Sequence, residues 1–328
     1  MKAIVCTRYG PPGALQFADV AMPVPKDDEV LIGIRAASVN PIDWHYMRGT
    51  PYALRLQAGL RRPNSTRLGI DVAGRLEAVG RDVTQLRPGD EVFGACRGAF
   101  AEYACASQRT VVPKPANITF EQAAAAPVAA SSALQGLRDK GQIRRGQRVL
   151  INGAAGGVGT FAVQIARAFG ADVTGVCSTR NLDMVRSIGA HRVVDYTEED
   201  FTGGGQRYDL ILDSVGNHPL SECRRALAAG GTLVLVGAPN KGRLLGPLAR
   251  MLKAVALSWF VSQKLLPFLA RLNKDDLMAI RELLETGKVA PVIDRSYPLS
   301  GVPEAIRYLE EGHARGKVVI TMDHRSEP

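Results

Sequence analysis

The sequence predicts an α/β protein made of a small barrel-like β domain and a doubly wound parallel sheet. A chain of 328 residues is longer than one hydrophobic core usually supports, which indicates about two domains. Short apolar runs separated by Pro and Gly fill the chain up to about residue 115 and are typical of an all-β domain. From about Glu121 onwards, strand-like and helix-like segments alternate, as in a parallel sheet with crossover helices.

The elements of the first domain follow from its turn residues. Strand-length apolar runs lie at 29–36 and 71–79, and turn sequences such as Pro11-Pro12-Gly13 and Pro88-Gly89-Asp90 separate the runs. The change to an Ala-rich, helical composition places the domain boundary near residues 115–120.

The second domain shows strands and helices in alternation. Gly170 and Gly189 stand where helices commonly end, and Pro219 can open a third helix. The predicted strands are 148–152, 172–177, 192–195, 209–213 and 232–237, and the first two helices are 161–169 and 181–188.

The chain is predicted to end with two helices and a strand. Asp275-Asp276 can cap a helix that ends at Gly287 and carries Leu277, Ile280, Leu283 and Leu284 on one face. A helix at 303–311 and a strand at 317–321 follow.

Composition and charge narrow the class of protein. Hydrophobic residues make up 46% of the chain and charged residues 22%, which excludes a disordered, collagen-like or coiled-coil protein. The net charge of +9 indicates an anionic partner and leaves open a phosphorylated cofactor, an anionic membrane surface and nucleic acid. Aromatic residues make up only 6%, a poor supply for stacking on single-stranded bases, so we expect no specific nucleic-acid partner.

The cysteines and the first residues indicate a compartment. Five scattered cysteines with no C-x-x-C pair favour buried, reduced thiols over disulfides or a clustered zinc site. A strand-like segment follows Met1 directly, and no apolar stretch reaches the roughly 18 residues of a membrane span. We therefore expect a cytoplasmic protein without a secretory leader.

The most informative segment runs from the predicted strand 148–152 into a glycine-rich turn and a helix. The turn has the form Ala154-x-Gly156-x-x-Gly159, which is the dinucleotide-binding fingerprint with alanine in place of its first glycine. Gly156 lets the backbone approach a pyrophosphate, Gly159 lets the helix lie close to the sheet, and free N–H groups at the helix start bind the anion. We predict that a dinucleotide binds here, at Ala155, Gly156, Gly157 and Val158; the alternative is a glycine turn with only a structural role.

The residues after the next predicted strand indicate which dinucleotide binds. An Asp or Glu about 20 residues beyond the glycine turn would bind the free ribose hydroxyl of NADH. No acid stands there; Ser178, Thr179 and Arg180 do, and the arginine can hold a phosphate with two N–H groups. This favours NADPH over NADH, and the alternative for Arg180 is a solvated surface side chain.

Several motifs occur in order along the whole chain and resemble one family. They are Met1-Lys2-Ala3, Ser38-Val39-Asn40-Pro41-Ile42-Asp43, Leu68-Gly69-Ile70-Asp71-Val72-Ala73-Gly74, Pro88-Gly89-Asp90-Glu91-Val92-Phe93-Gly94, the turn 154–159, and Gly230-Gly231-Thr232 up to Gly237. The sequence thereby resembles the medium-chain dehydrogenase/reductase superfamily, and within it the zinc-independent quinone oxidoreductase branch.

The resemblance implies a domain organisation and several binding residues. It implies a GroES-like β-barrel catalytic domain at 1–118, a Rossmann domain at 119–264, a return to the catalytic domain at 265–328, and cofactor and substrate in the cleft between the domains. Ser132 matches a hydroxyl at the nicotinamide-side phosphate or ribose, and Tyr196 matches a tyrosine near the adenosine phosphate. The strand ends at Val215, Gly237 and Ala238 match backbone that lines the nicotinamide.

The resemblance also bears on zinc. Zinc enzymes of the superfamily have Cys at the position of Asn40 and His at the position of Ile70, and neither residue present here is a good zinc ligand. We therefore expect no metal.

Without a metal to polarise an alcohol, the sequence favours reduction of a quinone or an α,β-unsaturated carbonyl by hydride from NADPH. The oxygen that becomes negative needs hydrogen-bond donors. The predicted donors are Asn40, Tyr46 and Tyr52, with His45 and Asp43 as further candidates; the alternative for each is a role in packing or in a turn.

Two segments are predicted to set substrate choice, 52–67 and 244–272. Residues 241–274 are both apolar and basic, which suits a wall of the substrate site or of a homodimer, with peripheral membrane contact as the alternative. Two other functions stay open: a dehydrogenase of another small carbonyl or alcohol, and an NADPH-binding regulatory or RNA-contacting protein without turnover.

Overall fold

The computed structural model of the protein describes residues 1–236 and 247–322. The chain divides into two compact units, each described here by itself. The first unit comprises Met1–Val128, Leu272–Gly287 and Pro291–Pro328, and the second comprises Ala129–Arg271 and Lys288–Ala290. The first unit is thus assembled from stretches on both sides of the second in the sequence, as the predicted return to the barrel requires.

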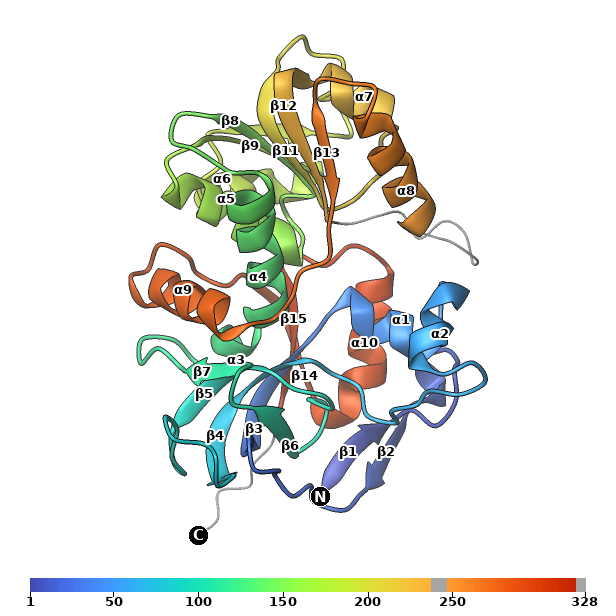
Figure 1. Ribbon diagram of the computed structural model, residues 1–328, viewed down its shortest axis with the longest axis vertical. Coiled ribbons are helices and arrows are strands. Elements are labelled where there is room, and N and C mark those ends of the chain that lie inside the picture. Colours follow the sequence, from blue (N-terminus) through green and yellow to red (C-terminus); the bar gives the residue numbers. More distant parts are fainter. Residues whose placement is uncertain (237–246, 323–328) are drawn as a thin grey trace. The chain divides into compact units, whose positions relative to one another are not determined.

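The first unit is built on a seven-stranded, mainly antiparallel sheet and a two-stranded hairpin (Figure 1). The large sheet has the order β14-β15-β3-β4-β5-β7, with β6 also paired to β3, and the hairpin is β1-β2. Its strands are β1 (Lys2–Val5), β2 (Gln16–Asp19), β3 (Glu29–Val39), β4 (Asp71–Val79), β5 (Glu91–Ala95), β6 (Tyr103–Ser107), β7 (Val111–Pro113), β14 (Ile293–Pro298) and β15 (Lys317–Thr321).

Short helices connect these strands. They are α1 (Pro41–Arg48), α2 (Arg55–Ala58), α3 (Phe120–Ala124), α9 (Lys274–Glu285) and α10 (Val302–Glu310), with 3-10 turns η1 (Pro12–Ala14), η2 (Tyr52–Leu54) and η5 (Leu299–Gly301). The core is formed by residues of the strands together with α1 and α10, and Ile32, Ile34 and Phe100 in it are almost completely buried. The C-terminal strand β15 pairs antiparallel with β3, so residues near the two ends of the sequence share this core.

The second unit is a six-stranded parallel sheet with the order β10-β9-β8-β11-β12-β13. Figure 1 shows α5 and α6 on one side of this sheet and α7 and α8 on the other, which is the doubly wound arrangement. Its elements are α4 (Pro127–Gln135), the π-helical η3 (Gly136–Lys140), β8 (Arg148–Asn152), α5 (Gly157–Ala168), β9 (Asp172–Cys177), η4 (Thr179–Asn181), α6 (Leu182–Ser187), β10 (Arg192–Asp195), β11 (Tyr208–Asp213), α7 (Leu220–Arg225), β12 (Leu227–Leu235), α8 (Pro247–Ser258) and β13 (Lys264–Pro267).

Helices on both faces explain the apolar strands of this sheet. Val149, Leu150 and Ile151 are fully buried in succession, because a parallel strand covered on both faces has no solvent side. Among the described residues, no helix is both long and apolar enough to cross a membrane.

The structure differs from the sequence prediction at α9 and β13, among other places. Asn273, and not Asp275 or Asp276, caps α9, because its side chain accepts the N–H of Asp276 at 2.9 Å. Strand β13 was not predicted; it pairs parallel with β12 and buries Leu265. Along the chain, the compact units alternate after residues 128, 271, 287 and 290, and the domain bounds 1–118, 119–264 and 265–328 stay a prediction.

Candidate functional site

The glycine turn of the second unit joins β8 to α5. Gly153 has φ +83°, which an L side chain rarely adopts, and Gly156 is the N-cap of α5 without a side-chain cap. A Cβ on Gly159 would lie 2.0 Å from the carbonyl oxygen of Gly153, so only glycine allows the helix to approach the turn. A Cβ on Gly156 would meet only that oxygen, at 3.5 Å. The open side of Gly156 and the uncapped N–H groups of α5 fit a pyrophosphate.

The carboxyl ends of β9 and β10 hold the residues predicted to choose the cofactor. Thr179 and Arg180 are exposed and Ser178 is half-buried. The hydroxyl of Thr179 lies 3.0 Å from that of Thr197, and a hydrogen bond from Thr179 helps to hold the pKa of Asp195 below its ordinary value. Asp195 is an acid at this edge that sequence reasoning missed, because it ends β10, whereas the residues expected to choose the cofactor follow β9.

Of the remaining predicted cofactor residues, two follow strands of this sheet, one lies in α4, and two lie outside the described part of the chain. Tyr196 directly follows β10 and is 55% exposed, and Val215 lies just after β11 and is 40% exposed. Ser132 is buried in α4. Gly237 and Ala238 lie outside the described residues.

A buried ion pair organises the loop that contains Val215. Asp213 ends β11, is completely buried, and accepts hydrogen bonds from the N–H groups of Val215 and Gly216 at 3.1 and 2.8 Å. Asn152 at the end of β8 donates to the same carboxylate at 2.8 Å, and Arg250 of α8 pairs with it at 2.7 Å. Sequence reasoning did not pair Arg250 with Asp213, because the two residues are 37 positions apart.

In the first unit, Asn40 belongs to a buried polar network. Its side-chain N–H₂ group donates to Asp71 at 2.8 Å and to the carbonyl of Ser38 at 3.4 Å, and its side-chain oxygen accepts from the Lys317 ammonium at 2.6 Å. Lys317 also pairs with Asp71 at 3.2 Å, and their side chains are 3% and 0% exposed. Both amide hydrogens of Asn40 are therefore engaged, and its amide is positioned from within the protein.

This network does not fit a zinc ion of the kind that zinc-dependent dehydrogenases bind. The Lys317 ammonium lies against the oxygen of Asn40 and already supplies the positive charge. Ile70 has no donor atom.

The first unit contains a cavity of about 580 Å³, a size suited to a small organic molecule. Asp43 and Tyr46 of α1 line it, together with one cysteine after β5 and one on β6, Cys96 and Cys105. Burial raises the pKa of both thiols, so they stay protonated and are poor nucleophiles. The other lining residues are Glu29, Gln57, Ala58, Pro63, Asn64, Ser65, Arg67, Leu68, Gly69, Ile70, Ala95, Arg97, Ala106, Ser107, Thr110 and Leu272.

The predicted proton and hydrogen-bond donors differ in their access to this cavity. Tyr46 lines it, whereas Asn40, Tyr52 and His45 are not among the lining residues. Tyr52 is 42% exposed and stacks with the Arg55 guanidinium, and the ring of His45 bonds the carbonyl of Thr50 at 2.7 Å.

Asp43 lines the cavity beside Tyr46. Its carboxylate accepts the backbone N–H of Asn40 at 2.8 Å, and burial raises its pKa to about 7. Asp43 is therefore a carboxyl group that can carry a proton near neutral pH.

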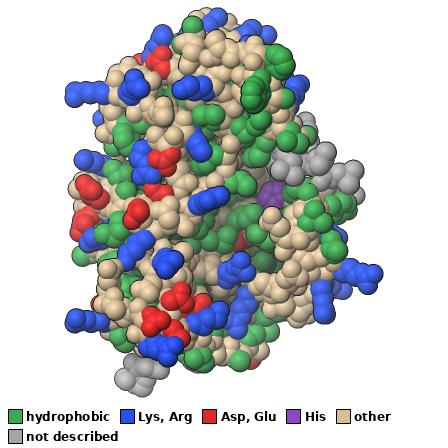
Figure 2. Space-filling model, in the orientation of Figure 1, with side chains coloured by type: hydrophobic (Ala, Val, Ile, Leu, Met, Phe, Trp, Pro, Cys, Tyr) green, Lys and Arg blue, Asp and Glu red, His purple; other side chains and the backbone are tan. Residues whose placement is uncertain are grey.

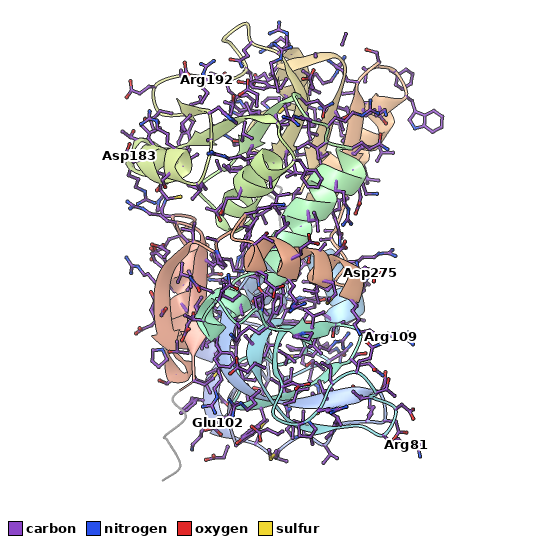
Figure 3. All side chains as sticks on the ribbon, turned by 90° about the vertical axis from the view of Figure 1, so that its left-hand side faces the viewer. Arg81, Glu102, Arg109, Asp183, Arg192 and Asp275 are labelled. Carbon is purple, nitrogen blue, oxygen red and sulfur yellow. The ribbon has the colours of Figure 1, made fainter. Side chains whose placement is uncertain are left out.

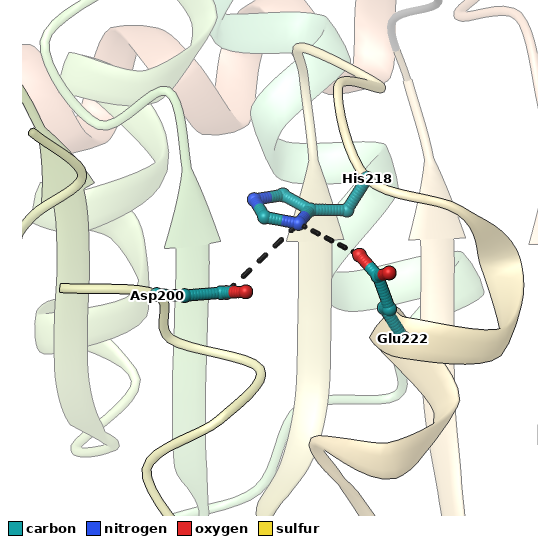
Figure 4. Close-up of side chains that lie close together, drawn as sticks. All are labelled: Asp200, His218 and Glu222. Atoms are coloured by element: carbon teal, nitrogen blue, oxygen red, sulfur yellow. Dashed lines mark hydrogen bonds and ion pairs between the residues drawn. The ribbon is translucent and has the colours of Figure 1, made fainter.

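One group of metal-ligating side chains occurs in the second unit, formed by Asp200, His218 and Glu222 (Figure 4). The Nδ1 atom of His218 lies 3.2 Å from Glu222 and 3.9 Å from Asp200. Ligands of a tetrahedral zinc ion would lie about 3.3 Å apart. Asp200 would have to move closer, yet both of its oxygens accept hydrogen bonds from Thr202. The group is thus a histidine paired with carboxylates rather than a preformed metal site.

Comparisons with known proteins identify the family of the chain. A family model described as "Alcohol dehydrogenase GroES-like domain" matches residues 26–116, and one described as "Zinc-binding dehydrogenase" matches residues 188–320. A chloroplastic quinone-oxidoreductase homolog of Spinacia oleracea is 34% identical over 334 residues, covering 98% of both chains. The 2-methylene-furan-3-one reductase of Solanum lycopersicum is 36% identical, covering 98% of this chain and 79% of its own.

Solved structures show the same similarity. The quinone oxidoreductase of Coxiella burnetii is 32% identical with a TM-score of 0.86 over 98% of this chain and 99% of its own. The Escherichia coli quinone oxidoreductase, solved as a complex with NADPH, is 25% identical with a TM-score of 0.83, over 98% of this chain and 100% of its own.

A GroES-like unit combined with a Rossmann unit that carries a dinucleotide turn defines an oxidoreductase that uses a nicotinamide cofactor. The chain belongs to the medium-chain dehydrogenase/reductase superfamily, in its quinone oxidoreductase branch, and is an oxidoreductase of the quinone and enone reductase type.

Proposed function

We propose that the protein reduces quinones or α,β-unsaturated carbonyls with NADPH, without zinc. The turn before α5 is the main support for this proposal, because its open glycine and uncapped N–H groups fit a pyrophosphate. Arg180 follows β9 at the place where a protein that binds the free ribose hydroxyl of NADH would have an acidic residue. The similar proteins are named as a quinone oxidoreductase homolog, a methylene-furanone reductase and an alkenal/one oxidoreductase, which supports the choice of substrate class.

In this proposal, residues of the second unit bind the cofactor and residues of the first unit bind the substrate. In the second unit, the Asp213–Arg250 pair holds the Val215–Gly216 backbone that faces the nicotinamide in this proposal. The bound cofactor supplies the hydride. In the first unit, the cavity excludes water around the conjugated carbonyl, and the Tyr46 hydroxyl donates a hydrogen bond to the oxygen that becomes negative.

Asp43 is a second proton carrier beside Tyr46. Because its pKa is raised to about 7, its carboxyl group is partly protonated at neutral pH and can replace the proton that the product takes up. Asn40 and Lys317 position the start of α1, because Lys317 donates to the side chain of Asn40 and the backbone N–H of Asn40 donates to Asp43.

NADPH oxidation measured against a panel of quinones, enones and alkenals tests the reaction. We expect turnover with NADPH on at least one of these classes. Binding of NADPH without consumption on any of them would overturn the proposal and favour a binding protein; turnover of a simple alcohol or aldehyde alone would favour another dehydrogenase.

Arg180→Ala tests the cofactor preference. Loss of the guanidinium should raise the KM for NADPH about tenfold or more and leave the KM for NADH nearly unchanged, because only NADPH carries the extra phosphate. Arg192→Ala is the control: this exposed arginine begins β10, at the end of the strand opposite Tyr196 (Figure 3). Equal effects of Arg180→Ala on both cofactors would contradict the assignment.

We also propose a cytoplasmic homodimer. Trp259 and Phe260, which follow α8, are 84% and 86% exposed, and Leu252 on α8 is 65% exposed. Figure 2 shows hydrophobic side chains gathered over α8. Edge strand β13, the last of the described strands in its sheet, follows this surface in the chain and offers unpaired backbone groups. A large exposed apolar patch of this kind marks an interaction surface.

A further inference from the structure

The cavity of the first unit carries two arginines that no carboxylate in the described part of the chain neutralises. Arg67 and Arg97 both line it, and neither forms an ion pair with a described acidic residue within 4.0 Å. The guanidinium of Arg67 donates a hydrogen bond to the carbonyl of Ala21 at 3.3 Å.

The two arginines lie on neighbouring segments. The N–H of Cys96 bonds the carbonyl of Ile70 at 2.9 Å, and the N–H of Gly98 bonds the carbonyl of Gly69 at 3.0 Å. A Cβ on Gly98 would lie 2.9 Å from the Cβ of Arg67, so the stem of Arg67 packs directly against the turn that carries Arg97. The two arginines therefore come from adjoining segments that both line the cavity.

The acids that line the cavity do not offset these charges. Glu29 is held by Lys26, whose backbone N–H donates to it at 3.1 Å and whose ammonium lies 3.9 Å away. Asp43 is bonded to the Asn40 N–H, and with its raised pKa it is partly neutral at pH 7. The cavity thus combines an apolar interior, donors at Tyr46 and Asp43, and two arginines that lack acidic partners.

We propose that this cavity selects conjugated carbonyl substrates that carry a carboxylate, which Arg67 and Arg97 bind while the carbonyl meets Tyr46. The proposal rests on the proposed reduction of quinones or enones and names the substrate class within it. Guanidinium groups bind carboxylates through paired, charge-assisted hydrogen bonds, so the two arginines favour the acid over an uncharged analogue of the same shape.

A matched pair of substrates tests this with the whole protein: an enone with a terminal carboxylate on its alkyl chain, and its methyl ester. At low salt, we expect kcat/KM with NADPH to be about tenfold higher for the acid than for the ester, and we expect the ratio to fall as salt screens the charges. Arg97→Gln and Arg67→Gln should each lower the ratio towards one. Arg109→Gln is the control, since it removes the same charge from an exposed residue that does not line the cavity (Figure 3).

A binding experiment separates this inference from the proposed function. Calorimetry with the saturated keto acid and its methyl ester measures the affinity of the cavity for each ligand, and neither ligand can be reduced at a conjugated double bond. Tighter binding of the acid, lost in Arg97→Gln and kept in Arg109→Gln, supports the carboxylate site even if no enone is reduced. Equal binding of acid and ester, or an unchanged preference in both cavity variants, overturns it even if the enones are reduced.

Discussion

At the scale of single residues, the structure places its most unusual chemistry in the first unit. Lys317, Asp71 and Asn40 lie buried together, and the carboxyl group of Asp43, whose pKa is raised, accepts the backbone N–H of Asn40. Removing one member of a buried ion pair leaves the other charged and unpaired, whereas an exposed pair contributes little. The chain offers both kinds of Lys–Asp pair for comparison.

Lys317→Met should destabilise the folded protein by about 3–5 kcal/mol, because Asp71 would keep a buried charge without its partner. The measurement is the denaturant midpoint followed by circular dichroism. Lys2→Met is the matched control, since Lys2 pairs with Asp19 at 2.6 Å on the surface, with side chains 46% and 73% exposed, and should change the midpoint little. Equal midpoints for the two variants would show that the buried pair contributes no more than the exposed one.

Asp43 should make stability depend on pH. Its pKa is about 7 in the folded protein and about 3.9 in an unfolded chain, so between these values the folded state binds the extra proton. This stabilising contribution is complete below pH 4 and is lost as the pH rises to about 7. We therefore expect Asp43→Asn, which does not titrate, to gain stability relative to the wild type as pH increases from 5 to 7.5. A difference in unfolding midpoint that stays constant over this range would contradict a raised pKa.

At the scale of elements, the two glycines Gly156 and Gly159 of the β8–α5 turn have different roles. The first is expected to serve cofactor binding and the second to serve folding. Gly159 is required by packing, because a Cβ there would lie 2.0 Å from a carbonyl oxygen, whereas Gly156 has room for one. The N-cap of α5 has φ −84° and ψ 176°, which alanine also adopts.

Gly156→Ala should therefore fold with a Tm near that of the wild type and bind NADPH at least tenfold more weakly, because the methyl group takes up the space of the pyrophosphate. Gly159→Ala should instead lower the Tm by several degrees. Thermal unfolding together with fluorescence titration of NADPH measures both effects. The reverse pattern, a large loss of Tm in Gly156→Ala with intact binding, would remove the phosphate from this turn.

The neighbouring strand ends provide a second test of cofactor choice. Asp195 carries a negative charge beside Thr179, which should repel an added ribose phosphate. Asp195→Asn should lower the KM for NADPH several-fold and leave the KM for NADH almost unchanged. Steady-state kinetics with both cofactors is the measurement, and an equal change in the two values would place this edge away from the phosphate.

Local signals predicted most elements, and contacts distant in sequence account for what was missed. Gly170, Gly189 and Gly287 follow predicted helices, and all three have positive φ. The partners in the Asn40 network are 31 and 277 residues apart, so no local pattern joins them. A sign was present nonetheless: Asp71 and Lys317 each begin a predicted strand and are followed directly by apolar residues, so a charge there needs a partner.

At the scale of the whole molecule, the fold class was predicted correctly, including a chain that returns to its first sheet through β14 and β15. What the sequence left open was the use of residues 241–274. The described part of this segment forms α8 and strand β13, with the aromatic pair Trp259 and Phe260 exposed between them. Covering these exposed aromatic side chains with a partner removes their apolar surface from water, which stabilises the complex.

The wild type should therefore sediment as a dimer, with twice the chain mass of 35.2 kDa, at micromolar concentration. Trp259→Ser combined with Phe260→Ser should give a folded monomer, because the change removes apolar contact area without touching the core. Phe17→Ser is the control: it removes an aromatic ring that is 50% exposed in the first unit and should leave the dimer intact. A monomeric wild type would contradict the homodimer. Such a monomer could instead use the aromatic pair to contact a membrane, because an anionic bilayer attracts a basic segment with exposed apolar rings. Binding of the wild type, but not of the double variant, to anionic vesicles at moderate salt would show this.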